Sequence, residues 1–151
     1  MVIKVQREDF DSFVEVCTLQ LDKGDIGAVV TFLGLVRQNE ARNLTTLELE
    51  HFPGMTERAL ADLEQQALSR WDIGAVLVIH RYGRLAIGEN IMMVAVTSRH
   101  RTEAFQAAEF LMDHLKTDAP FWKKEHLNDG HKWVEAAASD DVKRARWREL
   151  G

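Results

Sequence analysis

The first part of the chain carries both strand and helix patterns. Residues 2–5 form a short apolar run that predicts a strand. Apolar residues from Phe10 to Cys17 recur with helical spacing, and Asp9 is the expected N-terminal cap of that helix. The spacing predicts Cys17 on the buried stripe, as a small core residue. Residues 27–36 are nearly all apolar and rich in β-branched side chains, which is typical of a strand buried on both faces.

The middle of the chain repeats these two patterns. The predicted elements are a loop at 37–43, a half-exposed strand at 44–52, a helix at 55–71 and buried strands at 75–80 and 91–97. Glycine-containing turns at 82–83 and 88–90 separate the last two strands. A further helix is expected to have Thr102 as its cap and an apolar stripe from Phe105 to Leu115.

The C-terminal part predicts a hairpin followed by a helix. Pro120 forbids continuation of the preceding helix, and strands at 121–126 and 132–136 flank the turn signal Asp129-Gly130. The charged tail at 140–151 predicts a short helix that docks through Trp147. The order of elements predicts an α+β fold with a mixed or antiparallel sheet, packed helices and a C-terminal β-hairpin.

Composition narrows the class of protein. The chain has 151 residues, which suits one domain over 1–151 with room for a small β subdomain. A net charge of -5 argues against a general nucleic-acid binder. The single cysteine cannot form an internal disulfide, and the N-terminus lacks the apolar run of a signal peptide. No apolar stretch approaches the length of a membrane span. We therefore expect a soluble, cytoplasmic protein.

Two lysines stand out as candidate chemistry. Lys116 and Lys123 flank Pro120 in an aromatic segment, where burial and neighbouring cations lower the pKa of an amine. Such a lysine can act as an acid, base or nucleophile near neutral pH. A purely structural interpretation stays open, because Lys116 ends a helix whose dipole favours a cation. Lys123 and Lys124 should point to opposite faces of a strand, and the rings around them are expected in the core.

A second candidate is the basic segment before the helix at 105–115. Ser98, Arg99, His100 and Arg101 lie where free N–H groups and the helix dipole favour an anion, and an arginine fork binds phosphate or carboxylate. The alternative is that these arginines are solvated and pair with carboxylates. Arg37, at the end of the strand at 27–36, is a weaker candidate of the same kind.

Signals for a metal or nucleotide cofactor are absent from the sequence. The six histidines show no metal-binding spacing, and one cysteine cannot build a zinc cluster. There is no phosphate loop, no dinucleotide-binding glycine motif and no nucleophile elbow. We predict neither a metal nor a cofactor.

Taken together, the motifs resemble the large, catalytic subunit of molybdopterin synthase. The resemblance spans nearly the whole chain in order, and the lysine-proline-aromatic block is its most specific part. The matching blocks are residues 27–32 with Val36 and Arg37, then 49–55, 78–83, 98–101, 115–125 and 133–136.

The resemblance implies an α/β-hammerhead-like fold and a sulfurtransferase reaction. The family converts cyclic pyranopterin monophosphate to molybdopterin by installing two sulfurs as a dithiolene. The sulfur comes from the C-terminal Gly-Gly thiocarboxylate of a small ubiquitin-like partner, whose tail enters the large subunit. Two large subunits form a homodimer within a heterotetramer. Neither nucleic acid nor membrane is an expected partner.

The resemblance also implies roles for particular residues. Arg37, His100 and Arg101 match positions that line the pocket of the phosphorylated substrate. Lys116 matches the principal catalytic lysine and Lys123 the second, and both also contact substrate. Our hypothesis is that Lys116 is the general acid/base and that Lys123 assists electrostatically.

One position departs from the family. Some relatives carry an arginine that reaches a neighbouring subunit's pocket, where this chain has Ala137. Lys132 and Arg144 are the candidates to replace that cation.

Two other classes of function remain alternatives. A nucleic-acid or protein binding module could use the basic aromatic stretch from Phe121 to Lys124, because bases stack on rings beside cations. A non-catalytic scaffold for an acidic partner would tolerate exchange of Lys116 and Lys123.

Overall fold

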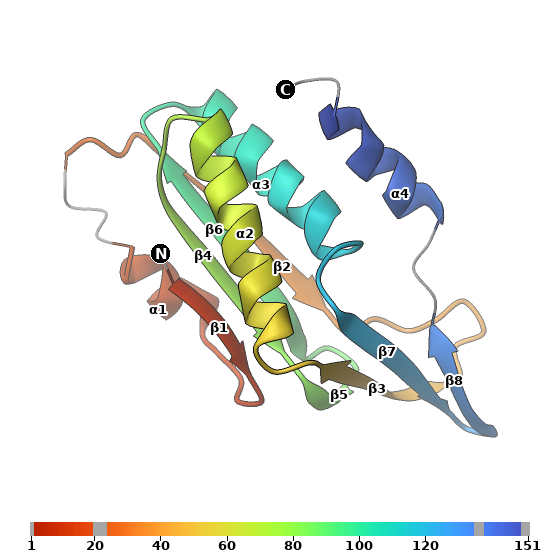
Figure 1. The fold of residues 1–151 in the computed structure, drawn as a ribbon. Coiled ribbons are helices and arrows are strands. Elements are labelled where there is room, and N and C mark those ends of the chain that lie inside the picture. Colours follow the sequence, from red (N-terminus) through yellow and green to blue (C-terminus); the bar gives the residue numbers. More distant parts are fainter. Residues whose placement is uncertain (1, 20–23, 135–137, 149–151) are drawn as a thin grey trace.

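The computed structural model describes residues 2–19, 24–134 and 138–148. In this part of the chain the strands form two four-stranded sheets, ordered β1-β4-β6-β2 and β5-β3-β7-β8 (Figure 1). The strands are β1 (Val2–Gln6), β2 (Ala28–Leu35), β3 (Leu44–His51), β4 (Ile73–Arg81), β5 (Gly83–Ala86), β6 (Asn90–Ser98), β7 (Phe121–Leu127) and β8 (Gly130–Val134). The helices are α1 (Ser12–Cys17), α2 (Met55–Arg70), α3 (Arg101–Leu115) and α4 (Ala138–Ala145), followed by a 3-10 turn at Arg146–Arg148.

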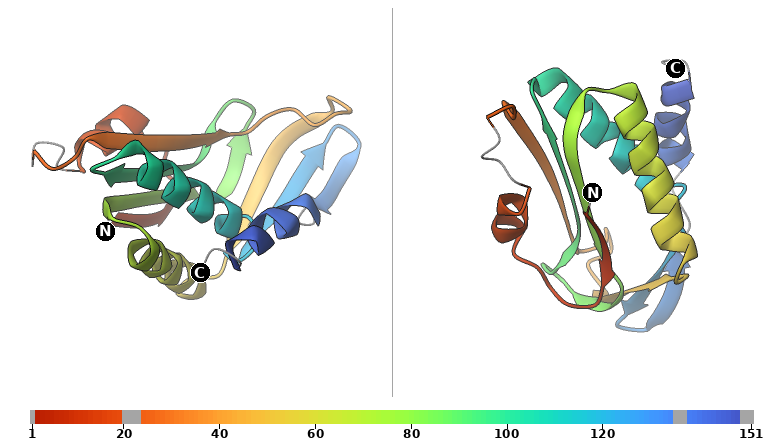
Figure 2. Two further views of the ribbon diagram at one scale, coloured as in Figure 1. Left: turned by 90° about the horizontal axis from the view of Figure 1, so that it is seen from above. Right: turned by 60° about the vertical axis from the view of Figure 1, so that its left-hand side comes forward.

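The first sheet is covered on both faces. α2 and α3 lie side by side on one face, and the short α1 lies on the other (Figures 1 and 2). The larger core cluster sits under α2 and α3 and includes Leu60, Val78, Val94 and Phe110. Because side chains alternate across a strand, the neighbouring residues of β4 and β6 form a second cluster on the opposite face. This layering confirms the predicted α+β class.

The second sheet extends beyond the first and has β3 and β7 at its centre (Figure 1). β1 runs parallel to β4, whereas all pairs within the second sheet are antiparallel. Leu47, Leu49 and Leu85 are buried beneath it. The predicted C-terminal hairpin is confirmed as β7 and β8, with Leu127 opposite Gly130 across the turn.

The predicted helical tail docks on α3 through Trp147. The indole of Trp147 is buried and packs edge-on against Trp71 and Phe110. Its Nε1 donates to a carboxylate oxygen of Asp113 at 2.8 Å, and Arg146 donates to the same oxygen. These contacts hold α4 beside the C-terminal end of α3, next to Lys116.

The predictions for the N-terminal helix were wrong in two respects. Asp11, not Asp9, is the cap, because its carboxylate accepts from the amides of Phe13 and Val14. Asp9 instead accepts from Asn90 and from its neighbouring amide. Cys17 is exposed rather than buried, since α1 is only 6 residues long and packs Val16 on the core while Phe13 and Val14 face outwards.

The prediction that the strand at 27–36 is buried on both faces was also wrong. β2 pairs only with β6 and forms the edge of its sheet. Its side chains Val29, Phe32, Leu33 and Leu35 are exposed in the single chain. An apolar edge strand of this kind is a surface that another chain can cover.

Three smaller predictions also need correction. α3 begins at Arg101 with His100 as its cap residue, not Thr102. Phe105, expected on the buried stripe, is 61% exposed. The turn expected at 82–83 opens a short strand, β5, that pairs with β3. No helix in the described part of the chain has the length and hydrophobicity to cross a membrane.

Candidate active site

A cavity of about 850 Å³ opens where the two sheets and the C-terminal end of α3 meet. Its walls come from the end of β2, the loop after it, β7 and the last turn of α3. The volume lies in the range of pockets that enclose a small organic molecule.

Both predicted catalytic lysines line this cavity. Lys116 follows the last residue of α3, and Lys123 projects from β7, so the fold brings together two residues from separate elements. The surrounding protein lowers the pKa of the Lys123 amine, and the positive charge of Lys116 lowers it further. Solvent still reaches the Lys123 side chain, because the cavity is open.

Asp140 places a carboxylate beside this pair of amines. It lies 3.8 Å from the Lys116 Nζ, and its charge opposes the decrease in the Lys123 pKa. Asp140 comes from α4, so the docked tail contributes a counter-ion to the site.

Arg37 also lines the cavity, on a loop fixed by its own side chains. Gln38 exchanges two hydrogen bonds with the backbone of Leu44, at 3.0 and 3.1 Å. Asn39 bonds both the side chain and the backbone of Asn43. Arg37 lines the cavity from this loop, and its guanidinium donates to the Gln38 carbonyl at 3.4 Å.

The cavity contains a histidine that the sequence patterns did not single out. His80, near the end of β4, is 6% exposed, and its ring stacks on Phe121 with centroids 3.6 Å apart. Burial and the charge of Lys123 lower the pKa of His80 to about 4. The sequence signal that could have identified His80 was its place in the family block at 78–83. The hydrophobic pattern alone predicts only that a residue at the end of an apolar strand belongs to the core.

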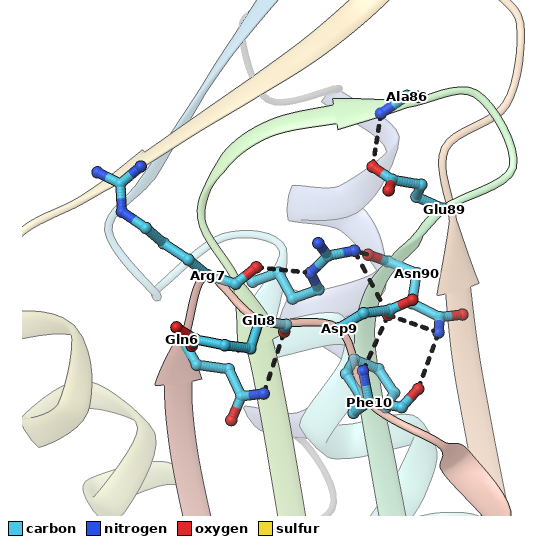
Figure 3. A network of polar contacts seen from close by, with 9 residues as sticks. Gln6, Arg7, Glu8, Asp9, Phe10, Ala86, Glu89 and Asn90 are labelled. Carbon is cyan, nitrogen blue, oxygen red and sulfur yellow. Dashed lines mark hydrogen bonds and ion pairs between the residues drawn. The ribbon is translucent and has the colours of Figure 1, made fainter.

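A polar network fixes the end of β4 just beyond His80. The buried guanidinium of Arg81 donates to the carbonyl oxygens of Arg7 and Asn90. Figure 3 shows Asp9 held between Asn90 and the backbone of Phe10 in the same network. Arg81 cannot shift without breaking these contacts, so the neighbouring His80 has a rigid support.

His100 and Arg101 lie at the opposite end of α3 from Lys116. The helix has 15 residues, which separates its ends by roughly 20 Å. Neither residue lines the cavity of its own chain, so a single chain brings Arg37, Lys116 and Lys123 together but not His100 or Arg101. Arg99 is exposed and lies 3.7 Å from Asp25, which fits the solvated interpretation for that arginine.

A glycine fixes the place of this basic segment. Gly27 donates to the Ser98 carbonyl at 3.0 Å, and a Cβ at Gly27 would collide with the Arg99 carbonyl oxygen. The start of β2 therefore contacts the segment that leads into α3, whereas the end of β2 opens into the cavity.

The position of Ala137 lies outside the described residues. Of its two candidate substitutes, Lys132 lines the cavity, whereas Arg144 pairs with Asp118 at 2.9 Å.

The basic aromatic stretch divides between two faces of β7, as predicted for Lys123 and Lys124. Lys124 faces away from the cavity and lies 5.3 Å from the ring centroid of Trp133. Trp122 and Trp133 are 43% and 52% exposed, so the expectation that these rings belong to the core was wrong. Phe121 alone packs inwards, against His80.

The arrangement suits an anionic substrate and proton transfer. Lys116, Lys123 and Arg37 supply positive charge to one cavity, and the lowered pKa of Lys123 makes release of its proton easier. Within the residues that the structure describes, no cluster of His, Cys, Asp and Glu could hold a metal ion.

Comparison with known proteins agrees with this geometry. Residues 5–118 match the model of the family described as MoaE protein. The chain belongs to the MoaE family. The molybdopterin synthase catalytic subunit of Ralstonia nicotianae is 49% identical over 146 residues, which cover 96% of this chain and 83% of that protein. The subunit of the same name from Cereibacter sphaeroides is 50% identical and is covered over its whole length.

Solved MoaE structures share the fold. The molybdopterin biosynthesis MoaE protein from Burkholderia ambifaria has a TM-score of 0.83 at 46% identity, and 97% of each chain is covered. A chain from a complex of subunits 1 and 2 of the Helicobacter pylori molybdopterin-converting factor has a TM-score of 0.76 at 18% identity, over 89% of this chain and 91% of that one. The family predicted from the sequence motifs is confirmed.

Proposed function

We propose that this chain is the catalytic subunit of a molybdopterin synthase, which converts cyclic pyranopterin monophosphate to molybdopterin. The observation that carries the proposal is the meeting of Lys116, Lys123 and Arg37 in one cavity of a MoaE-family chain. The substrate is an anion, and these cations can neutralise its phosphate. The reaction belongs to the cytoplasm.

The sulfur donor in this proposal is a small ubiquitin-like partner. Its C-terminal Gly-Gly thiocarboxylate carries the sulfur, and two glycines form a tail slim enough to enter the cavity. The Helicobacter pylori complex of subunits 1 and 2 has a chain of this fold bound to a second subunit, which supports such an assembly. The exposed Cys17, on α1, then needs no part in sulfur transfer.

In the proposed reaction the lysines transfer protons and stabilise negative charge. Attack of the thiocarboxylate sulfur on the pterin side chain requires proton transfer, and opening the cyclic phosphate develops negative charge on oxygen. Lys116 acts as general acid/base at the end of α3. Lys123 lines the same cavity and stabilises the developing negative charge from β7.

A second copy of the chain completes the phosphate site in this proposal. His100 and Arg101 cannot reach their own cavity along α3. β2 is an exposed apolar edge whose start contacts residues 98 and 99 and whose end opens into the cavity. Two-fold antiparallel pairing of β2 with its copy would bring each copy's basic segment beside the other's cavity. The assembly is then a homodimer with two small subunits.

Reconstitution tests the proposed function directly. The chain is mixed with thiocarboxylated small subunit and cyclic pyranopterin monophosphate, and dithiolene product is quantified. The expected result is product with the thiocarboxylate and none with the same partner ending in an ordinary carboxylate. Failure to form product with active partner and substrate would refute the proposal.

A further inference from the structure

The imidazole of His80 is a polar group to which the proposed reaction assigns no role. It is buried in the wall of the cavity, on the face of β4 that also carries Val78 and packs against α3. Its Nδ1 lies 2.9 Å from the carbonyl oxygen of Arg81. Among the described residues none bonds its Nε2.

The carbonyl of Arg81 determines which ring nitrogen holds the proton. A carbonyl oxygen only accepts hydrogen bonds, so the Nδ1 of a neutral His80 must be the donor. The Nε2 then carries a lone pair and is an acceptor. The stack on Phe121 and the fixed backbone of Arg81 hold the ring in one orientation.

The neutral form is the one present in the folded protein. Burial and the charge of Lys123 hold the pKa of His80 near 4, well below its ordinary value of 6.5. Near neutral pH the ring therefore offers an acceptor, not a second cation.

The cations and the amide side chains next to His80 in the cavity lining are not free acceptors. Lys116, Lys123 and Arg37 only donate hydrogen bonds. The amide side chains of Gln38 and Asn39 are occupied within their loop. The other side-chain acceptors in the lining are the carboxylates of Glu40 and Glu125, and Glu125 pairs with Lys132 at 3.2 Å.

We propose that the Nε2 of His80 accepts a hydrogen bond from an N–H group of the pterin rings. His80 then recognises the heterocycle, whereas the cations recognise the phosphate. A reduced pterin carries several N–H donors, and a buried acceptor favours a ligand that supplies one. This inference rests on the proposed function, because it concerns the same cavity and the same substrate.

The test compares variants that keep or remove this acceptor. His80→Asn places a short amide near the Arg81 carbonyl but does not reach the position of Nε2. His80→Gln carries its amide oxygen to that position, and His80→Phe keeps the ring on Phe121 without either nitrogen. His51→Phe is the control, because His51 neighbours Phe121 but does not line the cavity.

Affinities for cyclic pyranopterin monophosphate and for inorganic phosphate are measured by calorimetry on the dimer with the small subunit bound. Loss of one hydrogen bond should weaken pterin binding by about tenfold in the Asn and Phe variants. Phosphate affinity should not change, His80→Gln should retain most pterin affinity, and His51→Phe should match the wild type. Thermal unfolding identifies any variant that is not folded, and the remaining variant then decides the comparison.

Two results would overturn the inference. Equal loss of pterin and phosphate affinity would mean that His80 only supports the shape of the cavity. Unchanged pterin affinity in folded Asn and Phe variants would mean that Nε2 makes no contact with the substrate. A wild-type complex that neither binds the pterin nor forms product would instead refute the proposed function.

Discussion

Neighbouring side chains on β7 have different environments. Lys123 lines the cavity beside Lys116, and Lys124 faces outwards over Trp133. Both are lysines on one strand, so strand parity alone separates a candidate catalytic amine from a surface cation. Lys124 is therefore a matched control for any change at the site.

Lys116→Ala should remove turnover and leave partner binding intact. A general acid/base contributes roughly 10²-fold or more to the rate, so the loss should be at least that large. Lys124→Ala should keep turnover near the wild-type level. Steady-state assays measure the rates, and titration with the small subunit measures binding. If Lys116→Ala turns over normally, the amine has no part in the mechanism.

His80 makes stability depend on pH in a definite direction. Its pKa is about 4 in the folded chain, against an ordinary value of 6.5 in the unfolded one. Between these pH values the unfolded chain binds more protons, so the free energy of unfolding falls as pH falls. The decrease attributable to His80 is about 3 kcal/mol. Urea unfolding from pH 7 to 4 should show a shallower decrease in His80→Phe than in the wild type, and equal slopes would contradict the prediction.

Elements with a clear periodicity were predicted well from the sequence. The amphipathic helices α2 and α3 and the hairpin of β7 and β8 were found because each buries one regular face. β2 was misjudged, since an apolar run has the same appearance in a central strand as in an edge strand that another chain covers. α1 was misjudged because its spacing fits a buried stripe, although the helix is too short to bury one.

The site was predictable only in part for similar reasons. The lysine pair lies around one proline, so local sequence placed both amines together. His80 and Phe121 are 41 positions apart in the sequence, and only the contact between the two sheets reveals their stack. Arg101 and Lys116 are far apart because they lie at opposite ends of α3. The family motifs give the order of these residues but not the distance between them.

The C-terminal tail has one large buried side chain, Trp147, beside ion pairs such as that of Arg144 with Asp118. Trp147→Ala removes a buried indole and its bond to Asp113, which should cost about 3–5 kcal/mol of stability. Trp133→Ala is the matched control, because that indole is 52% exposed and should change stability little. Urea denaturation compares the two variants. Similar losses in both would mean that Trp147 is not the anchor of the tail.

At the scale of the whole molecule, a single chain holds an incomplete set of candidate groups. One end of α3 supplies Lys116 to the cavity, and the other end presents His100 and Arg101 to solvent. A two-fold assembly through β2 would bring Lys116 of one chain near His100 and Arg101 of the other. The exposed apolar edge would then help to complete the candidate active site.

Mixing two inactive variants tests this arrangement. Lys116→Ala and Arg101→Ala should each be inactive alone. After co-refolding in equal amounts, half of the dimers contain both variants, and each of these has one intact cavity. About a quarter of wild-type activity should therefore return. A mixture that stays inactive, although mixed dimers have formed, would place Arg101 outside the partner's cavity.

The parity of β7 also has a consequence for how the chain can change. Loss of one residue just before Phe121 would slide the strand by a single position and exchange the faces of Lys123 and Lys124. Total charge would stay the same, and a lysine would still follow a tryptophan. Lys124 would then take the place of Lys123, but the indole of Trp122 would replace the ring of Phe121 against His80. An alignment that scores residue types alone would miss this change in the cavity wall.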